Sequence, residues 1–228
     1  MSNKKVVLAF SGGLDTSVCV KYLQSKHNMD VITATIDCGQ EDDFDEIRKK
    51  SKNLGAIRHV NIDAKKEFVE RYVNRSIKAN GLYQGKYPLA TALARPLIAD
   101  KIMKVATQEN AIAVAHGCTG KGNDQVRFDI AMSSIDPGIK IIAPIRELNL
   151  TRDLEMKYAK KNNIPLNEEI KKYSTDANLW GRAIEAGILE DPWVEPPEEI
   201  FTLVKNKNIP AEYLELEFEN GIPIGVDN

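Results

Sequence analysis

The most constraining feature of the sequence is a glycine-rich stretch at residues 11–17, SGGLDTS, which directly follows a continuous apolar run. The run at residues 5–10 predicts a strand buried on both faces of a parallel sheet. A helical pattern follows at residues 16–26. Gly12 and Gly13 permit backbone conformations that strain other residues, so successive N–H groups can face one concavity at the start of that helix. The stretch therefore predicts a phosphate-binding loop.

The side chains of this loop fit the same interpretation. Ser11, Thr16 and Ser17 add hydroxyl donors, and Asp15 can hold a Mg²⁺ that accompanies the phosphates or can orient the loop. A simpler alternative is that Asp15 only caps the helix and the glycines only make a tight turn. The spacing matches neither a Walker A loop nor the dinucleotide-binding glycine motif. It resembles the pyrophosphate loop of the ATP pyrophosphatases, which adenylylate a substrate and release pyrophosphate.

Strand and helix patterns alternate up to about Pro165, where regular alternation is lost and prolines become frequent. The alternation predicts an α/β fold with an open, mostly parallel sheet and helices on both faces. A second glycine-rich loop, at residues 117–124, should lie beside the first, because the carboxyl ends of neighbouring strands form the ligand crevice. Pro96 should lie near the first turn of its helix or mark a kink. The expected strands are 5–10, 31–36, 57–62, 111–116 and 140–145, and the expected helices are 16–26, 43–54, 68–77, 91–109 and 152–162.

The end of the sequence predicts a β-hairpin. Apolar and acidic residues alternate over 213–219, Asn220-Gly221 is a type I′ turn signal, and alternation resumes over 222–226. A lone hairpin is marginal in water, so we expect it to need further strands or a partner surface.

Composition limits the class of protein. A net charge of −2 and a pI near 6.0 give no support to a protein that coats nucleic acid. Cys19, Cys38 and Cys118 are odd in number and far apart, which indicates neither a disulfide framework nor a metal site and fits a reducing cytoplasm. No run approaches the roughly 18 apolar residues of a membrane span, so we expect no membrane partner.

Four stretches together resemble the N-terminal part of the argininosuccinate synthase family, whose members join citrulline to aspartate at the expense of ATP. They are residues 9–17, 87–96, 116–127 and 173–187, of which the third, HGCTGKGNDQVR, is the most specific. The resemblance covers nearly the whole chain, although the family's proteins are considerably longer. It implies an adenine nucleotide alpha hydrolase-like domain at residues 1–165, an incomplete α+β synthetase domain at residues 166–228, and a homotetramer in the full-length family.

The resemblance also implies ligand positions. Arg127 offers a planar fork to a carboxylate, although a surface salt bridge for Arg127, a turn at Asn123-Asp124 and a core position for Tyr87 remain structural alternatives. The positions implied for ATP are Ala9, Phe10, Ser11, Gly12, Gly13, Leu14, Asp15, Thr16, Ser17, Ile36 and Gly117. Those implied for citrulline are Tyr87, Asn123, Arg127 and Ser174, and those implied for aspartate are Thr119, Asn123 and Asp124.

Two departures from the family concern the citrulline pocket. Ala92 and Ala183 stand where the family commonly has serine, and Thr91 or water can substitute. His116 is interpreted as structural rather than as a base. Lys121 either neutralises a phosphate or is solvated.

The implied mechanism is adenylylation followed by substitution, with ATP, Mg²⁺, citrulline and aspartate as the small molecules. Citrulline's ureido oxygen attacks the α-phosphorus, pyrophosphate leaves into the loop, and aspartate's amine displaces AMP. Such steps depend on positioning and charge stabilisation rather than on a nucleophilic residue. Asp124 is the catalytic candidate, because it can orient the amine or accept its proton.

Two other functions use the same loop. A tRNA sulfurtransferase would need catalytic cysteines and a basic RNA surface, and a non-catalytic nucleotide-binding module would bind ATP without releasing pyrophosphate. We also expect the 228-residue chain to bind ATP but to form little argininosuccinate alone.

Overall fold

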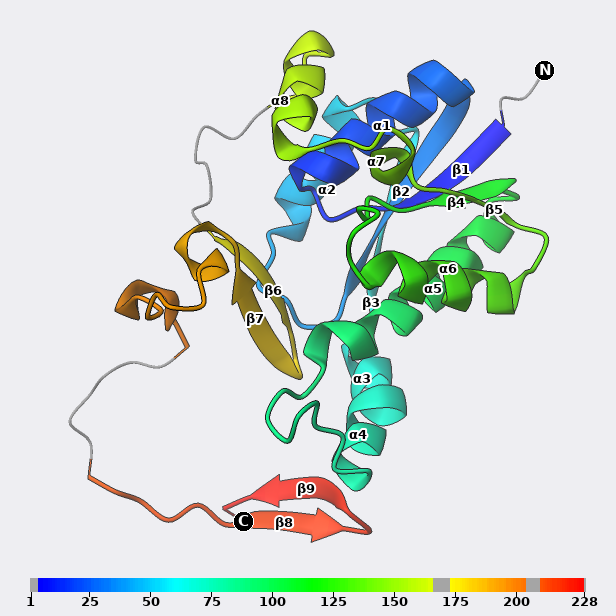
Figure 1. Cartoon of the computed structure of the whole chain (residues 1–228). Helices are drawn as coiled ribbons and strands as arrows, with labels where there is room; N and C mark the ends of the chain where they lie inside the picture. Colours follow the sequence, from blue (N-terminus) through cyan, green and yellow to red (C-terminus); the bar gives the residue numbers. More distant parts are fainter. Residues whose placement is uncertain (1–3, 166–172, 204–209, 228) are drawn as a thin grey trace.

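A parallel sheet of five strands forms the centre of the molecule (Figure 1). The computed structural model describes residues 4–165, 173–203 and 210–227. The strand order is β3-β2-β1-β4-β5, and every neighbouring pair is parallel. The strands are β1 (Lys4–Ala9), β2 (Met29–Asp37), β3 (Arg58–Asp63), β4 (Ala113–Ala115) and β5 (Lys140–Ile142). The predicted α/β fold is confirmed, and the order reverses between β1 and β4, which creates a crevice where their loops meet.

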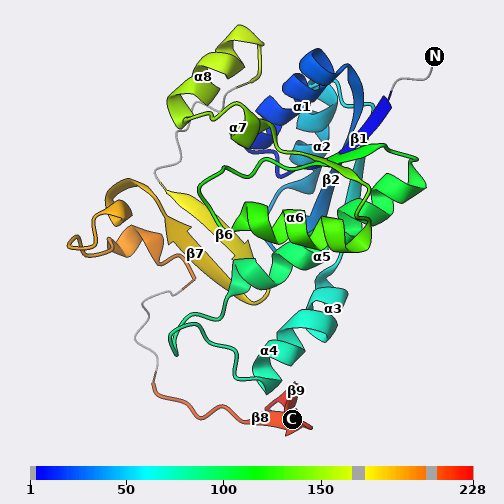
Figure 2. The ribbon, with the colours of Figure 1, turned by 45° about the vertical axis from the view of Figure 1, so that its right-hand side comes forward.

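Helices cover both faces of this sheet (Figures 1 and 2). Val6 and Leu8 of β1 belong to one apolar cluster, whereas Val7 between them belongs to another, as the alternation of side chains along a strand requires. The first cluster packs under α1 (Leu14–His27), α2 (Phe44–Asn53), α7 (Pro144–Glu147) and α8 (Arg152–Lys161), and the second under α5 (Ala90–Gln108) and α6 (Asp124–Ile135).

A third apolar cluster extends the core toward a helical arm. The pattern at residues 68–77 predicts one helix, and the arm consists of α3 (Lys65–Phe68), a π-helical turn (Val69–Val73) and α4 (Asn74–Lys78). Phe68 and Val73 of the arm pack with Ile36 of β2 and Leu97 of α5. The prediction of a helix is confirmed, but the π-turn was not predicted.

Two expectations about prolines are corrected by the structure. The fifth strand ends at Ile142 rather than at residue 145, because Pro144 begins α7. Pro96 lies inside α5, beyond its first turn, so the placement near the first turn is wrong, and the alternative that Pro96 marks a kink stays a prediction. Leu89, the residue directly before α5, has a φ of +59°. No glycine or asparagine in the sequence marks this left-handed position.

Residues from 174 onward form two antiparallel hairpins. The first consists of β6 (Ser174–Asn178) and β7 (Gly181–Glu185), which the sequence pattern did not predict. Two short 3₁₀ turns follow, at Gly187–Glu190 and Glu198–Ile200. The second hairpin, β8 (Leu216–Glu219) and β9 (Ile222–Val226), confirms the prediction, and Asn220 and Gly221 have φ values of +50° and +76°. A type I′ turn requires positive φ at both positions.

The β6–β7 hairpin is attached to the sheet region through backbone acceptors. Trp180 Nε1 donates to the Pro88 carbonyl at 2.7 Å, and Asn178 Nδ2 donates to the Ala90 carbonyl at 2.8 Å. The Leu179 N–H donates to the Cys38 carbonyl at 2.9 Å. The hairpin thereby contacts α5. The expected domain boundary near Pro165 falls beside residues 166–172, which lie outside the described residues.

A search of the described helices for a segment with the length and hydropathy of a membrane span found no candidate.

Candidate functional site

The glycine-rich loop joins β1 to α1 at the carboxyl edge of the sheet. Gly12 has a φ of +76°, and Gly13 is the N-cap of α1. The Gly13 carbonyl accepts from the Ser17 N–H at 3.1 Å and from the Ser17 hydroxyl at 2.7 Å. Ser17 is fully buried, so its hydroxyl shapes the loop. Ser11 Oγ accepts from the Gly13 N–H at 3.3 Å.

The N-terminus of α1 differs from that of α2. On α2, Asp43 is the N-cap, and its carboxylate accepts from the N–H groups of Asp45 and Glu46. On α1, Gly13 is the N-cap residue and Asp15 lies inside the first turn, so the alternative in which Asp15 is the N-cap of this helix is wrong. The first N–H groups of a helix have no intrahelical partner. The loop therefore presents backbone donors at the positive end of α1, which is an arrangement suited to phosphate.

The second glycine-rich loop meets the first, as predicted. Gly117 follows β4, which is the neighbour of β1. A Cβ on Gly117 would lie 3.1 Å from Thr16 Cγ2 and 3.5 Å from the Thr16 backbone nitrogen. An added Cβ would press against Thr16, so the two loops pack closely against each other.

Ile36, the expected adenosine contact, is buried at the carboxyl end of β2. Its side chain packs in the core, so a ligand can reach only its backbone. Ala34, two residues earlier, directs its carbonyl toward Phe10, at 2.9 Å from the Phe10 nitrogen. Backbone carbonyls two residues apart on a strand point to the same side, so the Ile36 carbonyl also points toward the crevice. There it accepts a hydrogen bond from Gln40 Nε2 at 2.9 Å.

Charged side chains from three elements meet at the start of α6. Asp124 accepts from Arg127 Nη1 and from Arg95 Nε, each at 2.7 Å. Arg95 Nη2 also lies 3.6 Å from Asp176 Oδ1 on β6, and its guanidinium lies over the Phe128 ring at 5.9 Å. Burial lowers the pKa of Arg95, but the charges of Asp124 and Asp176 outweigh this and raise it. Arg95 thus holds α5, α6 and β6 together.

Sequence reasoning missed Arg95 as a site residue. It lies in the middle of a helix whose apolar spacing indicated a core element, and its partners are 29 and 81 residues away in the sequence, at Asp124 and Asp176. The nearest signal was its place in the stretch 87–96, which carries part of the family resemblance.

The structure brings together most positions expected for citrulline and aspartate. Asn123 is the N-cap of α6, directly before Asp124, and Thr119 is exposed in the loop that precedes it. Ser174 shares a face of β6 with Asp176, because the two are separated by two positions on one strand. Ala183 is the cross-strand partner of Asp176.

Tyr87 lies at the opposite end of β6. It is half-buried and bridges to Tyr83 across the loop before α5. The next residue, Pro88, accepts the hydrogen bond from Trp180 just beyond β6. The structure therefore places Tyr87 beside the hairpin that carries Ser174 but not at the Asp124 cluster.

His116 has a structural environment, as interpreted from the sequence. Its Nδ1 accepts from the Cys118 N–H at 3.3 Å, so its Nε2 donates to Asp129 at 2.9 Å. The ring is 1% exposed and stacks on Phe128 at 5.4 Å between centroids. Burial lowers the pKa of His116, which keeps the ring neutral.

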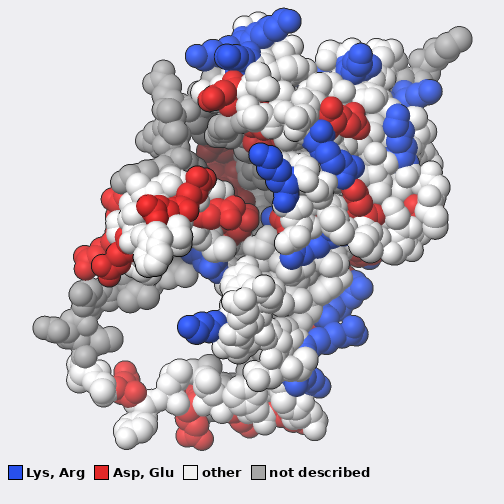
Figure 3. Space-filling model, viewed as in Figure 1, with Lys and Arg blue, Asp and Glu red and all other residues white. Residues whose placement is uncertain are grey.

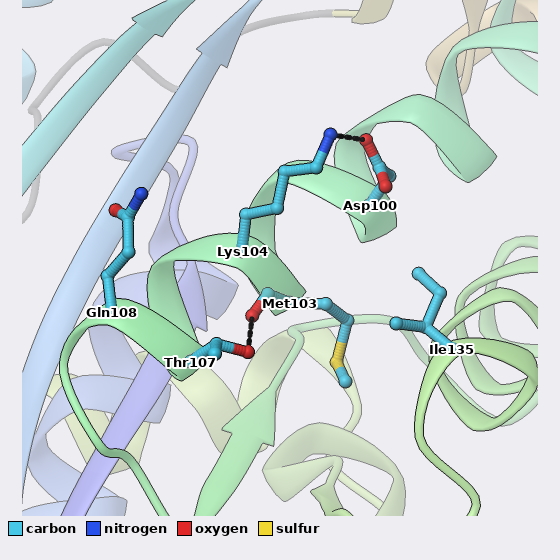
Figure 4. A pocket seen from close by; sticks show the side chains of 6 residues that line it. All are labelled: Asp100, Met103, Lys104, Thr107, Gln108 and Ile135. Carbon is cyan, nitrogen blue, oxygen red and sulfur yellow. Dashed lines mark hydrogen bonds and ion pairs between the residues drawn. The ribbon is translucent and has the colours of Figure 1, made fainter.

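One hollow of about 300 Å³ lies away from this crevice (Figure 4). Lys104 extends along α5 to Asp100, with its Nζ 2.8 Å from the carboxylate, and Ile135 of α6 lies on another side of the hollow. None of the residues that line it is a predicted ligand position. The hollow therefore provides no alternative to the crevice.

The face that Figure 3 shows carries charged side chains of both signs. Basic and acidic side chains are interspersed over the sheet region on the face that Figure 3 shows, and acidic side chains gather on the segment after β7. That segment, at residues 186–203, contains Glu190, Asp191, Glu195, Glu198 and Glu199.

Comparison with known proteins gives consistent results. Residues 5–165 match the family model described as "Arginosuccinate synthase N-terminal HUP domain", and residues 173–228 match "Arginosuccinate synthase C-terminal domain". The argininosuccinate synthase of Pyrococcus furiosus is 53% identical over 227 residues, which are 98% of this chain and 55% of the relative. That of Pyrobaculum aerophilum is 52% identical over 230 residues, covering 100% of this chain and 58% of the relative.

A third relative, the argininosuccinate synthase of Brevibacillus brevis, is 50% identical over 231 residues, or 100% of this chain and 55% of the relative. The chain therefore spans slightly more than half the length of the curated relatives that it matches. The identity extends over both matched regions, and the resemblance found in the motifs is confirmed. This chain belongs to the argininosuccinate synthase family.

Proposed function

We propose that this chain takes part in the ATP-dependent ligation of citrulline to aspartate, which yields argininosuccinate, AMP and pyrophosphate. One observation carries the proposal. The uncapped α1 N-terminus and the Gly117 loop meet where the strand order reverses between β1 and β4. Ligands of open α/β sheets bind at such a point.

ATP is assigned to the crevice edge formed by residues 9–17. The N–H groups at the start of α1 hold its phosphates, and Gly117 allows the nucleotide to pass close to the backbone. The Ile36 backbone faces the same crevice and is assigned to the adenosine. Thr16 and Ser17 act by shaping the loop, since both are buried.

Mg²⁺ fits this site as a partner of the phosphates. It usually keeps several waters and takes one or two carboxylates plus phosphate oxygens. Asp15 stands in the first turn of α1 and is the residue assigned to it. The ion would neutralise charge that develops on the phosphates, and the search of the described residues found no cluster of three ligating side chains that would suggest a separate metal centre.

Citrulline and aspartate are assigned to the neighbourhood of Asp124. Arg127 directs one nitrogen to Asp124 and retains other donors of its fork for a substrate carboxylate. Asn123 and Ser174 supply neutral donors for citrulline, and Tyr87 bounds its pocket from the α5 side. Thr119, Asn123 and Asp124 are assigned to aspartate.

In the proposed reaction, the ureido oxygen of citrulline attacks the α-phosphorus, and the bond to the pyrophosphate oxygen breaks. Pyrophosphate leaves toward the N-terminus of α1, whose dipole stabilises its charge. The amine of aspartate then attacks the ureido carbon of the citrullyl-adenylate, loses a proton and displaces AMP. The protein's contribution is positioning and charge stabilisation, which together can supply most of a rate enhancement.

Asp124 is assigned to orienting the amine. Both of its oxygens already accept from guanidinium groups, one from Arg95 and one from Arg127. A carboxylate held on both oxygens has a fixed position, which suits an electrostatic partner that orients an ammonium group.

The cysteines argue against the sulfurtransferase alternative. Burial raises the pKa of Cys118 to about 12 and that of Cys38 to about 11. Cys19 is fully buried, and its pKa is also raised by burial. The thiolate is the reactive form, so none of these environments favours sulfur transfer.

The remaining assignments are coarser. We propose a cytoplasmic location, consistent with three free cysteines, and a homotetramer, which light scattering of the purified protein tests. We also propose that residue 165 divides a nucleotide-binding domain from the start of a synthetase domain.

The experiment for the proposed function is a citrulline-dependent pyrophosphate assay. The chain is incubated with ATP, Mg²⁺ and citrulline, and pyrophosphate and AMP are measured with and without aspartate. The proposal expects MgATP binding and pyrophosphate release that requires citrulline, with little argininosuccinate formed by this chain alone when aspartate is added. Binding of ATP without such release would favour the non-catalytic nucleotide-binding module, and absence of ATP binding would contradict both.

A further inference from the structure

A lysine outside every predicted ligand position contacts the pyrophosphate loop. Lys50 lies on α2, and its Nζ donates to the Gly12 carbonyl at 2.5 Å across 38 positions of sequence. The same helix packs against the loop, since a Cβ on Gly12 would lie 3.0 Å from Ile47 Cγ1. The α2 helix therefore brings one ammonium group to the loop that the proposed function assigns to pyrophosphate.

The hydrogen-bond partner of Lys50 carries no charge. Arg48 on the same helix pairs with Asp45 at 3.3 Å, whereas Lys50 hydrogen-bonds a neutral carbonyl. Burial lowers the pKa of Lys50, and the charge of Glu46 opposes that effect. A partly buried ammonium group is stabilised by an anion, and two of its three N–H donors remain after the bond to Gly12.

The ammonium group of Lys50 lies close to the start of α1. The Gly12 carbonyl and the Gly13 N–H belong to one trans peptide unit, so Lys50 Nζ lies within about 5 Å of the Gly13 nitrogen, on the opposite side of that peptide from its N–H. Gly13 is the N-cap of α1, where the uncapped N–H groups begin. Rotation about the bonds of the flexible Lys50 side chain would bring its free donors toward a phosphate bound to those groups.

We propose that Lys50 is a pyrophosphate-binding residue, which holds the loop through Gly12 and contacts the β- and γ-phosphates of ATP and the pyrophosphate that is released. This inference rests on the proposed function and extends it by one residue. A simpler alternative is that Lys50 only holds the loop in shape. Only the phosphate-binding role requires a positive charge at residue 50 for pyrophosphate affinity when the shape of the loop is unchanged.

The test compares Lys50→Gln, Lys50→Arg and the control Lys49→Gln. Lys49 is the exposed neighbour on α2. Calorimetry measures binding of inorganic pyrophosphate, MgATP and AMP, and amide NMR signals of Gly12 and Gly13 report the shape of the loop. Glutamine can still donate a hydrogen bond but carries no charge.

We expect Lys50→Gln to weaken pyrophosphate and MgATP binding about tenfold or more, because a charge-assisted hydrogen bond contributes about 1.5–3 kcal/mol. AMP binding and the Gly12 and Gly13 signals should stay unchanged, Lys50→Arg should retain most of the affinity, and Lys49→Gln should match the unaltered chain. Unchanged pyrophosphate affinity in Lys50→Gln would overturn the inference. Loss of affinity with displaced Gly12 and Gly13 signals would show that Lys50 only holds the loop.

The unaltered chain separates this inference from the proposed function. If it binds MgATP and Lys50→Gln binds equally well, the inference fails and the proposed function stands. If the unaltered chain binds neither MgATP nor pyrophosphate, the proposed function fails, and the role of Lys50 fails with it.

Discussion

The sheet region, residues 4–165, and the later region, described at residues 173–203 and 210–227, differ in what they bury. Both faces of the sheet are covered, and Val6, Leu8, Leu97 and Ile102 are completely excluded from solvent. In the described part of the later region no residue is buried, and Trp193 is 94% exposed. Hydrophobic burial is the dominant favourable term in folding, so the sheet region stabilises itself, whereas the later region depends on what it contacts.

The later region is held mainly where it touches the sheet region. Asn178, Leu179 and Trp180 donate hydrogen bonds to carbonyls of the sheet region, and Arg95 reaches Asp176 from α5. The β8–β9 hairpin instead lies near the end of α4, where Gly221 approaches Lys78 (Figure 1). The comparison indicates that β6 and β7 are positioned by their contacts with the first region.

The largest expected effect comes from equal truncations in the two regions. Leu97→Ala removes a fully buried side chain and should lower the free energy of unfolding by about 2–5 kcal/mol. Leu214→Ala, at a side chain 64% exposed, should change it by less than about 0.5 kcal/mol. Chemical denaturation measures both, and similar losses at the two positions would contradict the comparison.

A glycine at the junction tests how β6 and β7 are attached. Gly39 has a φ of +93°, and a Cβ there would lie 2.7 Å from Leu179 Cδ2. Gly39→Ala should therefore detach the hairpin through strain and steric overlap, with an effect of about 2–3 kcal/mol on the junction. In a Trp193→Phe background, Trp180 fluorescence reports that detachment.

Gly85→Ala is the matched control, because Gly85 has a φ of +70° and no atom within 4 Å of the added Cβ. It carries the backbone strain without the overlap, and it should leave Trp180 fluorescence unchanged. Adding Leu179→Ala to Gly39→Ala should restore part of the attachment. A Gly39→Ala protein with native Trp180 fluorescence would show that the junction does not depend on this packing.

A smaller effect is expected on the pH dependence of the sheet region. Burial lowers the pKa of His116 in the folded state, whereas the unfolded chain has the ordinary value near 6.5. The unfolded state thus binds more protons below that value, and stability falls as the pH decreases. The free energy of unfolding should therefore be lower at pH 5.5 than at pH 7. The free energy of unfolding of His116→Gln should lack this part of the pH dependence. An identical pH dependence in both proteins would show that His116 does not cause it.

The smallest effect is expected between Arg95 and Asp176. Their atoms lie 3.6 Å apart, and the Asp176 side chain is 49% exposed. A double-mutant cycle with Arg95→Gln and Asp176→Asn should give a coupling energy of about 0.2–1 kcal/mol. A coupling above about 2 kcal/mol would mean that this pair, rather than the backbone bonds of Asn178 to Trp180, holds the two regions together.

Much of the sheet region could be predicted because its strands and helices are specified locally. The apolar runs before Gly12 and Gly117 indicate buried strands, and the glycines after them mark the loops at their carboxyl ends. The β8–β9 hairpin was equally predictable, since alternation and Asn220-Gly221 are local signals. The exposure of this hairpin to solvent was not predictable, because alternation specifies a strand but not what packs against it.

The unpredicted features depend on distant partners. The strands β6 and β7 contain STDAN and GRAIE, which lack apolar alternation, and they form against α5 and Pro88. Arg95 and Lys50 stand on helices whose patterns indicate only a packed face, and their partners come from other elements. A sequence pattern describes neighbours along the chain and therefore misses side chains whose role is set by contacts between elements.

The central claim, that the loop at residues 11–17 binds the phosphates of ATP beside Gly117, is tested most directly by NMR on the nitrogen-15-labelled chain. Glycine amides report the site and the later region in one spectrum. On addition of MgATP the account predicts shifts at Gly12, Gly13 and Gly117, with no change at Gly187 and Gly221. Unchanged signals at Gly12 and Gly13 at saturating MgATP, or equal shifts at Gly221, would contradict it.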